Sequence, residues 1–266
     1  MKILQLGNGG GFDVDATSSA FLIDNTGDSY TLFDCGWGVL AKLKKLHEDD
    51  DEAFTFNKLT NIFISYLHED HIGNLTTLIY YMYFTHKKWI GVLTGKDTYK
   101  PLKKVLSICD TELKAGKPTK ANMYYLIKLL DYVDTRESES YYSNHNNIVV
   151  STPAYHGTVP AHGLAIINKQ SSVVITGDTK AYEPIEQFVK RLPRIKYRTE
   201  NDDDKVQEHY ITKQVTVFHD FSHWDNPSRN VHACKSDIAS EYSAKFADKL
   251  IYYHTNEPFN QEWQEF

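Results

Sequence analysis

The sequence predicts a mixed α/β fold in which two stacked β-sheets carry helices on their outer faces. Within residues 1–95, short strands lead into a strand–loop–helix–strand order, and residues 148–266 repeat this logic. Between these halves, residues 96–147 are rich in Lys, Asp and Tyr. Two halves of similar order favour layered sheets, and a chain of 266 residues can bury a substantial core. We therefore expect one domain over residues 1–266.

Short apolar runs bounded by turn residues predict the strands of the first half. These strands cover residues 2–6, 19–24, 29–34, 61–66 and 90–94. The turn Asn25-Thr26-Gly27-Asp28 joins the second strand to the third as a hairpin. Helical periodicity predicts two helices, over residues 39–47 and 75–86.

The segment over residues 96–147 is expected to be a helical insertion. Its helices are predicted over residues 99–109 and 122–133, before a loose polar end at 135–147. The strands predicted for the second half cover residues 148–151, 163–168, 172–176, 214–219 and 249–253. Helices are expected over residues 182–191 and 235–247, with a polar loop over 193–213.

Composition disfavours several classes of protein. The formal net charge is -6, and acidic clusters at residues 49–52 and 202–204 would repel phosphate, so binding to long nucleic acid is not expected. Cys35, Cys109 and Cys234 form no Cys-x-x-Cys pair, which favours a reducing compartment. The apolar run at the N-terminus is too short for a signal peptide, and no segment has the eighteen consecutive apolar residues of a membrane span. We expect a cytoplasmic protein.

Two glycine-containing segments resemble nucleotide-binding loops without matching them. Gly7-Asn8-Gly9-Gly10-Gly11 follows a strand, but Phe12 stands where a dinucleotide loop needs a small residue, and no helix pattern follows. The segment Gly91 to Lys96 is one residue short of a P-loop, and Asp97 occupies the place of the magnesium-binding hydroxyl. We exclude both kinds of site.

The chemistry-bearing motif follows a predicted buried strand. Tyr66, His68, Asp70 and His71 lie within six residues of a polar loop, and two imidazoles with a carboxylate are common ligands of catalytic zinc. An ordinary polar loop with surface histidines is the competing interpretation. Further polar residues end other predicted strands, namely His156, Asp178 and His254. Their recurrence in this order favours a metal site.

These motifs resemble those of the metallo-β-lactamase superfamily, whose hallmark is H-x-H-x-D-H. The chain reads Y-x-H-x-D-H from Tyr66 to His71, and it is most similar to the ribonuclease Z-like phosphodiesterase branch. The supporting segments are Leu6 to Gly9, Leu32 to Gly36, His156 to Gly163 and Thr176 to Thr179. The resemblance implies an αββα four-layer sandwich with a helical insertion at about residues 96–147.

The resemblance also implies a two-metal hydrolase. One metal would be held by His68, His156 and a bridging Asp178, and the other by Asp70, His71, Asp178 and His254. Zinc is the expected metal, with manganese as the alternative, and Asp70 would also orient the attacking hydroxide. Asp220 and His232 would form a carboxylate–imidazole pair in which His232 protonates the leaving oxygen.

Two positions depart from the pattern of the family. Tyr66 replaces the first histidine, and a phenol with a pKa of about 10 binds zinc poorly unless the metal deprotonates it. We therefore expect one firmly held metal and one weak or absent metal. Asp220 stands where the branch has glutamate, which shortens the reach to His232 by one methylene.

The expected substrate is a small phosphodiester. Ribonuclease Z enzymes that trim tRNA carry an arm between the positions of His156 and Asp178, where this chain has only 21 residues. Armless relatives include phage-encoded anti-Pycsar phosphodiesterases, which implies cleavage of a cyclic nucleotide in a host cytoplasm. A homodimer is expected by family analogy alone. Alternatives are an RNA 3′-end endonuclease, a degenerate protein that sequesters a nucleotide without turnover, and lactone or thioester hydrolysis.

Overall fold

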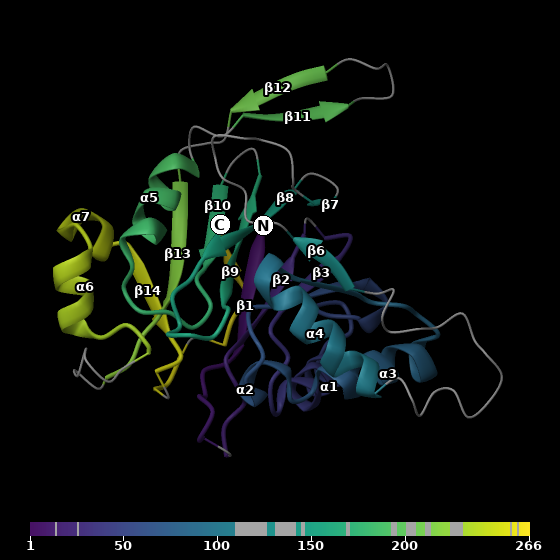
Figure 1. Ribbon diagram of the computed structural model, residues 1–266. Coiled ribbons are helices and arrows are strands. Elements are labelled where there is room, and N and C mark those ends of the chain that lie inside the picture. Colours follow the sequence, from purple (N-terminus) through teal and green to yellow (C-terminus); the bar gives the residue numbers. More distant parts are fainter. Residues whose placement is uncertain are drawn as a thin grey trace.

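The computed structural model of the protein forms a layered α/β sandwich (Figure 1). It describes residues 1–13, 15–25, 27–109, 127–130, 142–144, 147–168, 171–192, 196–200, 206–210, 214–223, 231–255, 257–259 and 261–266. None of the helices in these residues combines the length and the apolar character needed to cross a lipid bilayer.

Within the described residues, the first sheet has seven strands. In spatial order they are β15 (Gln264–Glu265), β1 (Lys2–Gly7), β2 (Ala20–Asp24), β3 (Tyr30–Phe33), β4 (Leu59–Ile64), β5 (Gly91–Gly95) and β6 (Ile127–Leu130). The pairing is antiparallel from β15 to β3 and parallel from β3 to β6. The parallel strands therefore end at one edge of the sheet.

The second sheet has six strands among the described residues. In spatial order they are β14 (Leu250–Tyr253), β13 (Gln214–Asp220), β10 (Ser171–Ile175), β9 (His162–Ile167), β8 (Asn147–Pro153) and β7 (Tyr142–Asn144). Strands β14, β13 and β10 are parallel, and β9 runs antiparallel to both β10 and β8. Consequently β8, β10, β13 and β14 all end in the same direction.

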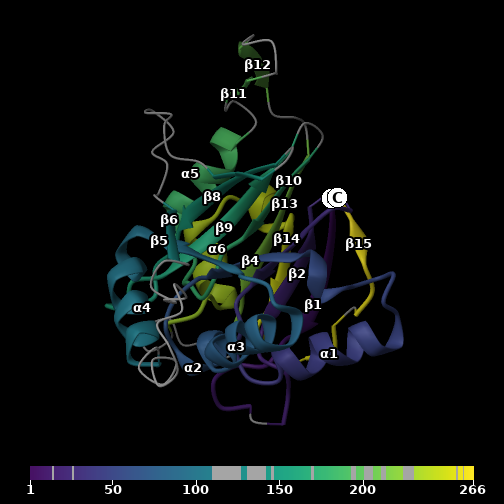
Figure 2. The ribbon, with the colours of Figure 1, turned by 90° about the vertical axis from the view of Figure 1, so that its right-hand side faces the viewer.

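Helices cover the outer face of each sheet, as Figure 1 shows with α1, α3 and α4 on one side and α5, α6 and α7 on the other. The first group is α1 (Val39–Asp49), the 3-10 turn η1 (Phe56–Lys58), α2 (Glu69–Ile72), α3 (Leu75–His86) and α4 (Lys96–Cys109). The second group is α5 (Glu183–Arg191), α6 (Lys235–Glu241) and α7 (Ala244–Ala247). Figure 2 turns the face of the molecule that carries α1, α3 and α4 toward the viewer.

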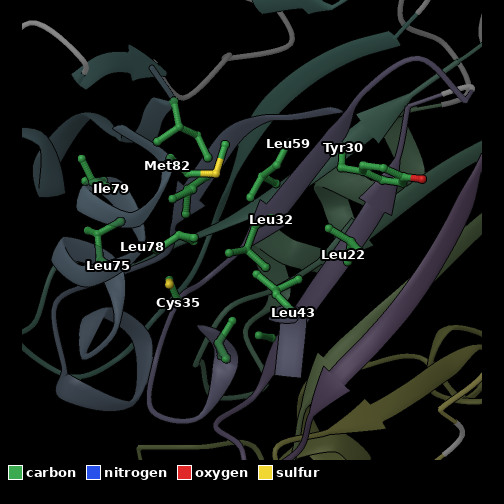
Figure 3. Packing of buried hydrophobic residues seen from close by; sticks show 14 of the residues in the cluster. Leu22, Tyr30, Leu32, Cys35, Leu43, Leu59, Leu75, Leu78, Ile79 and Met82 are labelled. Atoms are coloured by element: carbon green, nitrogen blue, oxygen red, sulfur yellow. The ribbon is translucent and has the colours of Figure 1, made fainter. Parts of the chain in front are cut away.

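Three buried clusters hold the four layers together. Aromatic residues fill the space between the sheets, where the ring of Phe21 lies 5.0 Å from Phe218 and 5.1 Å from Tyr253. On the outside of the first sheet, Leu78 and Met82 of α3 pack toward strand residues such as Leu59 (Figure 3). A similar cluster lies under α5, α6 and α7. The αββα sandwich expected from the sequence is thereby confirmed.

Three expectations about secondary structure are wrong. The centre of the helix predicted over residues 122–133 is strand β6, and β7 lies in the polar end predicted at 135–147. The described part of the predicted helical insertion therefore holds one helix, α4, and two edge strands. The loop predicted over 193–213 contains a hairpin of β11 (Lys196–Glu200) and β12 (Val206–Tyr210), which stands apart from the larger sheets (Figures 1 and 2). Short runs of mixed apolar and polar residues are compatible with either a helix or a strand. Pairing with a neighbouring strand then decides which of the two forms.

The packing between the sheets makes a prediction about stability. Phe21 is fully buried between Phe33, Phe218 and Tyr253. We expect Phe21→Ala to lower the free energy of unfolding by about 3–5 kcal/mol because it leaves a cavity between the sheets. The measurement is urea unfolding followed by circular dichroism. Phe84→Ala, at an aromatic residue that is 55% exposed, is the matched control and should change stability little. Equal losses in both variants would contradict the sandwich packing.

Candidate metal centre

The ends of six strands bring the candidate residues together. Each residue stands at or shortly after the carboxyl end of a strand that points to the same edge of the sandwich, the position at which open α/β sheets commonly hold their ligands. The strands and residues are β3 with Asp34, β4 with Tyr66, β8 with His156, β10 with Asp178, β13 with Asp220 and β14 with His254. The short helix α2 then carries Asp70 and His71 back toward this edge.

Four side chains form the centre of the site. One ligand atom each from Asp70, His71, Asp178 and His254 lies within 4.8 Å of the others. His71 Nε2 is 3.4 Å from both Asp70 Oδ2 and Asp178 Oδ1. His254 Nε2 is 3.5 Å from Asp70 Oδ2. These are the four residues that the sequence predicted for one metal.

Three buried polar atoms in this centre have no hydrogen-bond partner among the described residues. These atoms, His71 Nε2, Asp178 Oδ1 and His254 Nε2, are inaccessible to solvent. Leaving such atoms unpaired costs about 1–3 kcal/mol each. A divalent cation bound by imidazole nitrogens and carboxylate oxygens would satisfy all three at once. The residues present therefore fit a metal.

The electrostatics of the centre favour a cation as well. Burial opposes ionisation of Asp178, yet His254 and His71 hold the pKa of its carboxyl well below the ordinary value. Burial likewise lowers the pKa of His254, but Asp178, Asp220 and Asp70 raise it to about 10. The imidazoles thus take up positive charge because of the carboxylates around them. A bound cation would balance the same negative charge and leave the imidazoles neutral.

Asp34 orients His71 from behind, a role that the sequence analysis did not assign. Asp34 Oδ2 accepts hydrogen bonds from His71 Nδ1 at 2.7 Å and from Ser65 Oγ at 2.7 Å. The Ser65 N–H donates to the other oxygen, Oδ1, at 2.8 Å. Fixing Nδ1 in this way presents Nε2 of His71 to the metal. The signal in the sequence was an aspartate directly after the apolar pair Leu32-Phe33.

The glycine-rich segment after β1 serves the site, although it is no dinucleotide loop. Asn8 Oδ1 accepts a hydrogen bond from the backbone N–H of His254 at 2.6 Å. A Cβ on Gly10 would lie 3.0 Å from His254 Nε2, and one on Gly11 would lie 3.4 Å from the Asp70 carboxyl. The backbone of this segment closes one wall of the metal centre, and a side chain on Gly10 would crowd the His254 ring.

The Tyr66 ring packs against three histidine rings, those of His68, His71 and His156. Its ring centroid lies 4.6 Å from that of His68, 4.3 Å from that of His71 and 4.7 Å from that of His156. The hydroxyl donates a hydrogen bond of 2.6 Å to Asp178 Oδ2. Burial, and then the nearby Asp178, raise the pKa of Tyr66 far above its ordinary value, so the phenol keeps its proton. One oxygen of the predicted bridging carboxylate is therefore occupied by Tyr66.

The remaining predicted ligands of the first metal lie beside Tyr66. His156 is buried, with Nδ1 unpartnered among the described residues, and burial lowers its pKa, which favours the neutral form. His68 is exposed, and its ring centroid lies 5.4 Å from that of His156. Among the described residues, neither histidine belongs to a group of three or more ligands within 4.8 Å of one another. Their role as metal ligands remains a prediction.

Asp220 and His232 stand next to the central four. His232 Nδ1 is 2.8 Å from Asp220 Oδ2, so the shorter aspartate side chain still reaches the imidazole. The Thr179 N–H also donates to Asp220 Oδ2, and His254 Nδ1 lies 3.2 Å from Oδ1. Burial lowers the pKa of His232, but Asp220 and Asp178 raise it above the ordinary value. With a side chain that is 24% exposed, His232 reaches the surface of the site.

Comparison with solved structures identifies the class of protein. Human tRNase Z, short form, matches with a TM-score of 0.64 and 18% identity over 100% of this chain and 99% of its own. The metallo-β-lactamase fold protein YhfI from Bacillus subtilis matches with a TM-score of 0.62 and 18% identity, over 96% of this chain and 86% of its own. Unliganded yeast PDE1 matches with a TM-score of 0.61 and 16% identity, over 97% of this chain and 89% of its own. The chain is a protein of the metallo-β-lactamase fold.

The family follows from the sequence match. The family described as Anti-Pycsar protein Apyc1 matches residues 1–197, about three quarters of the chain, and this protein belongs to it. The matched range contains Tyr66, Asp70, His71 and Asp178, whereas His232 and His254 lie beyond it. No curated protein matches the chain.

The contact between Asp34 and His71 predicts the metal affinity of an Asp34 variant. Asp34→Asn removes the charge that fixes His71 Nδ1, and we expect zinc to bind about 10–100-fold more weakly. Competition with a chromophoric chelator measures the affinity, and thermal unfolding checks the fold. Asp51→Asn, at an exposed aspartate, is the control and should bind zinc as the wild type does. Unchanged affinity in a folded Asp34→Asn protein would contradict the orienting role.

The place of Tyr66 predicts how many metals the protein holds. Because its hydroxyl occupies Asp178 Oδ2, we expect about one zinc per chain after dialysis. Tyr66→His replaces the phenol with a ligand and should raise the count to about two, measured by plasma mass spectrometry. Tyr66→Phe, which keeps the ring without a donor or ligand, should hold about one. Two zinc ions in the wild type, or one in Tyr66→His, would show that Tyr66 does not set the count.

Proposed function

We propose that this protein is a metal-dependent phosphodiesterase that hydrolyses a small diester, most specifically a 3′,5′-cyclic nucleotide. One observation carries the proposal. Asp70, His71, Asp178 and His254 form a candidate cation site, and the Asp220–His232 pair lies directly beside it. Phosphodiester hydrolysis needs both a cation for the phosphoryl charge and a proton for the leaving oxygen. This arrangement offers the two within one site.

Each residue has a defined part in the proposed reaction. A cation held by the four central residues would supply Lewis-acid polarisation of a phosphoryl oxygen. Asp34 keeps the His71 ring turned toward that position through its Nδ1 proton. Asp220 holds the Nδ1 proton of His232, which leaves Nε2 as the atom that gives a proton to the leaving oxygen. Asp70, on the first turn of α2, is placed to orient the attacking water.

The comparisons support phosphodiester cleavage, and the short segment between His156 and Asp178 supports a small substrate. Human tRNase Z shows by its name that this fold serves phosphodiester cleavage, and the Anti-Pycsar family name agrees with the sequence resemblance to cyclic-nucleotide phosphodiesterases. Between His156 and Asp178, strands β9 and β10 pair directly and account for most of the residues. This segment has no room for a tRNA-gripping arm. The net charge of -6 also disfavours a long polyanion.

Tyr66 favours one second candidate, a protein that binds and sequesters a nucleotide without turnover. Its hydrogen bond to Asp178 removes one ligand position from the predicted pair of metals. The central four residues still offer a complete mononuclear site, which a pure binding protein would not need. Hydrolysis at one metal is therefore the proposal that we favour.

The proposed function predicts turnover that depends on Asp178. Purified protein with zinc or manganese should hydrolyse 3′,5′-cyclic nucleotides, with release of the linear nucleotide measured by chromatography. Asp178→Asn keeps the shape of the side chain and removes its charge, and we expect a loss of at least about 100-fold in kcat. If the wild-type protein folds and binds metal but shows no turnover, the proposal that it is a hydrolase is wrong. Tight binding of the unhydrolysed nucleotide would then favour sequestration.

A further inference from the structure

A cleft of about 360 Å³ opens beside the metal centre. His156 belongs to both, because it lines the cleft while its ring lies 5.3 Å from that of His232. The other walls come from the chain between β8 and β9, from the start of α4 and from the start of α5. A group attached to a phosphate at the metal centre can therefore extend into this cleft.

Two tyrosines form an aromatic wall of the cleft. The ring centroids of Tyr155 and Tyr182 are 5.7 Å apart, at an interplanar angle of 38°. Tyr182 packs against the core under α5, whereas Tyr155 is 47% exposed. The backbone of Tyr155 is fixed, since its N–H donates to Thr179 Oγ1 and its carbonyl accepts from the Lys180 N–H. An exposed ring on a rigid backbone is a ready surface for stacking a planar group.

Asp97 supplies the polar side of the cleft, beside the buried ring of His162. The His162 side chain is only 10% exposed, and both of its ring nitrogens are inaccessible to solvent, so neither can contact a molecule in the cleft. The ring is accommodated by Gly95, where a Cβ would come within 2.1 Å of it. The Asp97 side chain is 72% exposed, and its Oδ2 lies 3.9 Å from His162 Nε2. The Asp97 carboxylate is therefore the polar group of this wall that a bound molecule can reach.

A nucleobase matches these two walls. Its flat face suits the Tyr155 ring, and its edge carries amino donors beside ring-nitrogen acceptors. The Asp97 carboxylate accepts a hydrogen bond from an amino group at this edge. A plain sugar or alkyl group would gain little from the aromatic wall.

We propose that the cleft bounded by Tyr155, Tyr182, His162 and Asp97 binds the nucleobase of the substrate, an assignment that rests on the proposed function. The base stacks on Tyr155 while its phosphodiester lies at the metal centre, and His156 marks the boundary between the two. The site therefore acts on nucleoside diesters rather than on diesters in general, because the base contributes binding that a base-free diester lacks.

The kinetic test compares two substrates that differ only in the base. Adenosine 3′,5′-cyclic monophosphate and the 3,5-cyclic phosphate of methyl riboside share the cyclic diester. We expect Tyr155→Ala to raise KM for the nucleotide about tenfold, as loss of one base–aromatic stack does, and to raise KM for the riboside much less. Tyr155→Phe keeps the ring face and should stay within about twofold of the wild type. Phe84→Ala, an exposed aromatic outside the cleft, is the control.

Equal losses on the two substrates would overturn the base site and show that Tyr155 merely supports His156. If the wild type hydrolyses neither compound, the proposed function is wrong, but the base site can still be tested by a second measurement. Photo-crosslinking with 8-azidoadenosine 3′,5′-cyclic monophosphate and peptide mapping then locates the base. Label on Tyr155 or Tyr182, reduced by competing adenosine cyclic monophosphate, supports the cleft. Label elsewhere, or none, overturns it.

Discussion

The site depends on one buried carboxylate, that of Asp178, whose two oxygens face different partners. Oδ2 accepts the hydrogen bond from Tyr66, whereas Oδ1 points toward His71 and His254 and has no hydrogen-bond partner among the described residues. A fully buried carboxylate needs compensating partners, because burial of an unpaired charge is costly. The phenol supplies a neutral donor on one side, and the other side is left to a cation. The whole centre is arranged around this division.

The sandwich itself creates the conditions for such a centre. Parallel strands in both sheets end at one edge, so side chains from distant parts of the chain meet there without any long loop. Asp34 and His254, each directly after a strand, adopt left-handed backbone conformations with φ of 60° and 65°. Such conformations are unfavourable for residues other than glycine, and they persist here because strands and hydrogen bonds on both sides hold them. The core between the sheets thereby stabilises the geometry of the site.

The sequence predicted most strands and helices next to the site but failed at the sheet edges. Strand β4 (Leu59–Ile64), predicted over residues 61–66, ends in an apolar run and is followed by a polar loop, so the local pattern identified it. β6 and β7 gave no such signal, because an edge strand is defined by the neighbour with which it pairs. The same limit applies to Asp34. Its position after a strand was visible, whereas its hydrogen bond to His71, 37 residues away, depends on the fold.

The sequence by itself predicted the candidate donors, since imidazoles and carboxylates recur at strand ends in the order from His68 to His254. It also showed that Tyr66 breaks the expected pattern. Only the tertiary structure decided what the phenol does instead, namely that it donates to Asp178 in the middle of three histidines. The cleft lined by Tyr155 and His162 likewise emerged only when the start of α4, the chain between β8 and β9, and the start of α5 were brought together. Residue types are encoded locally, but partners separated by more than 100 residues, such as Tyr66 and Asp178, are set by the packing of the two sheets.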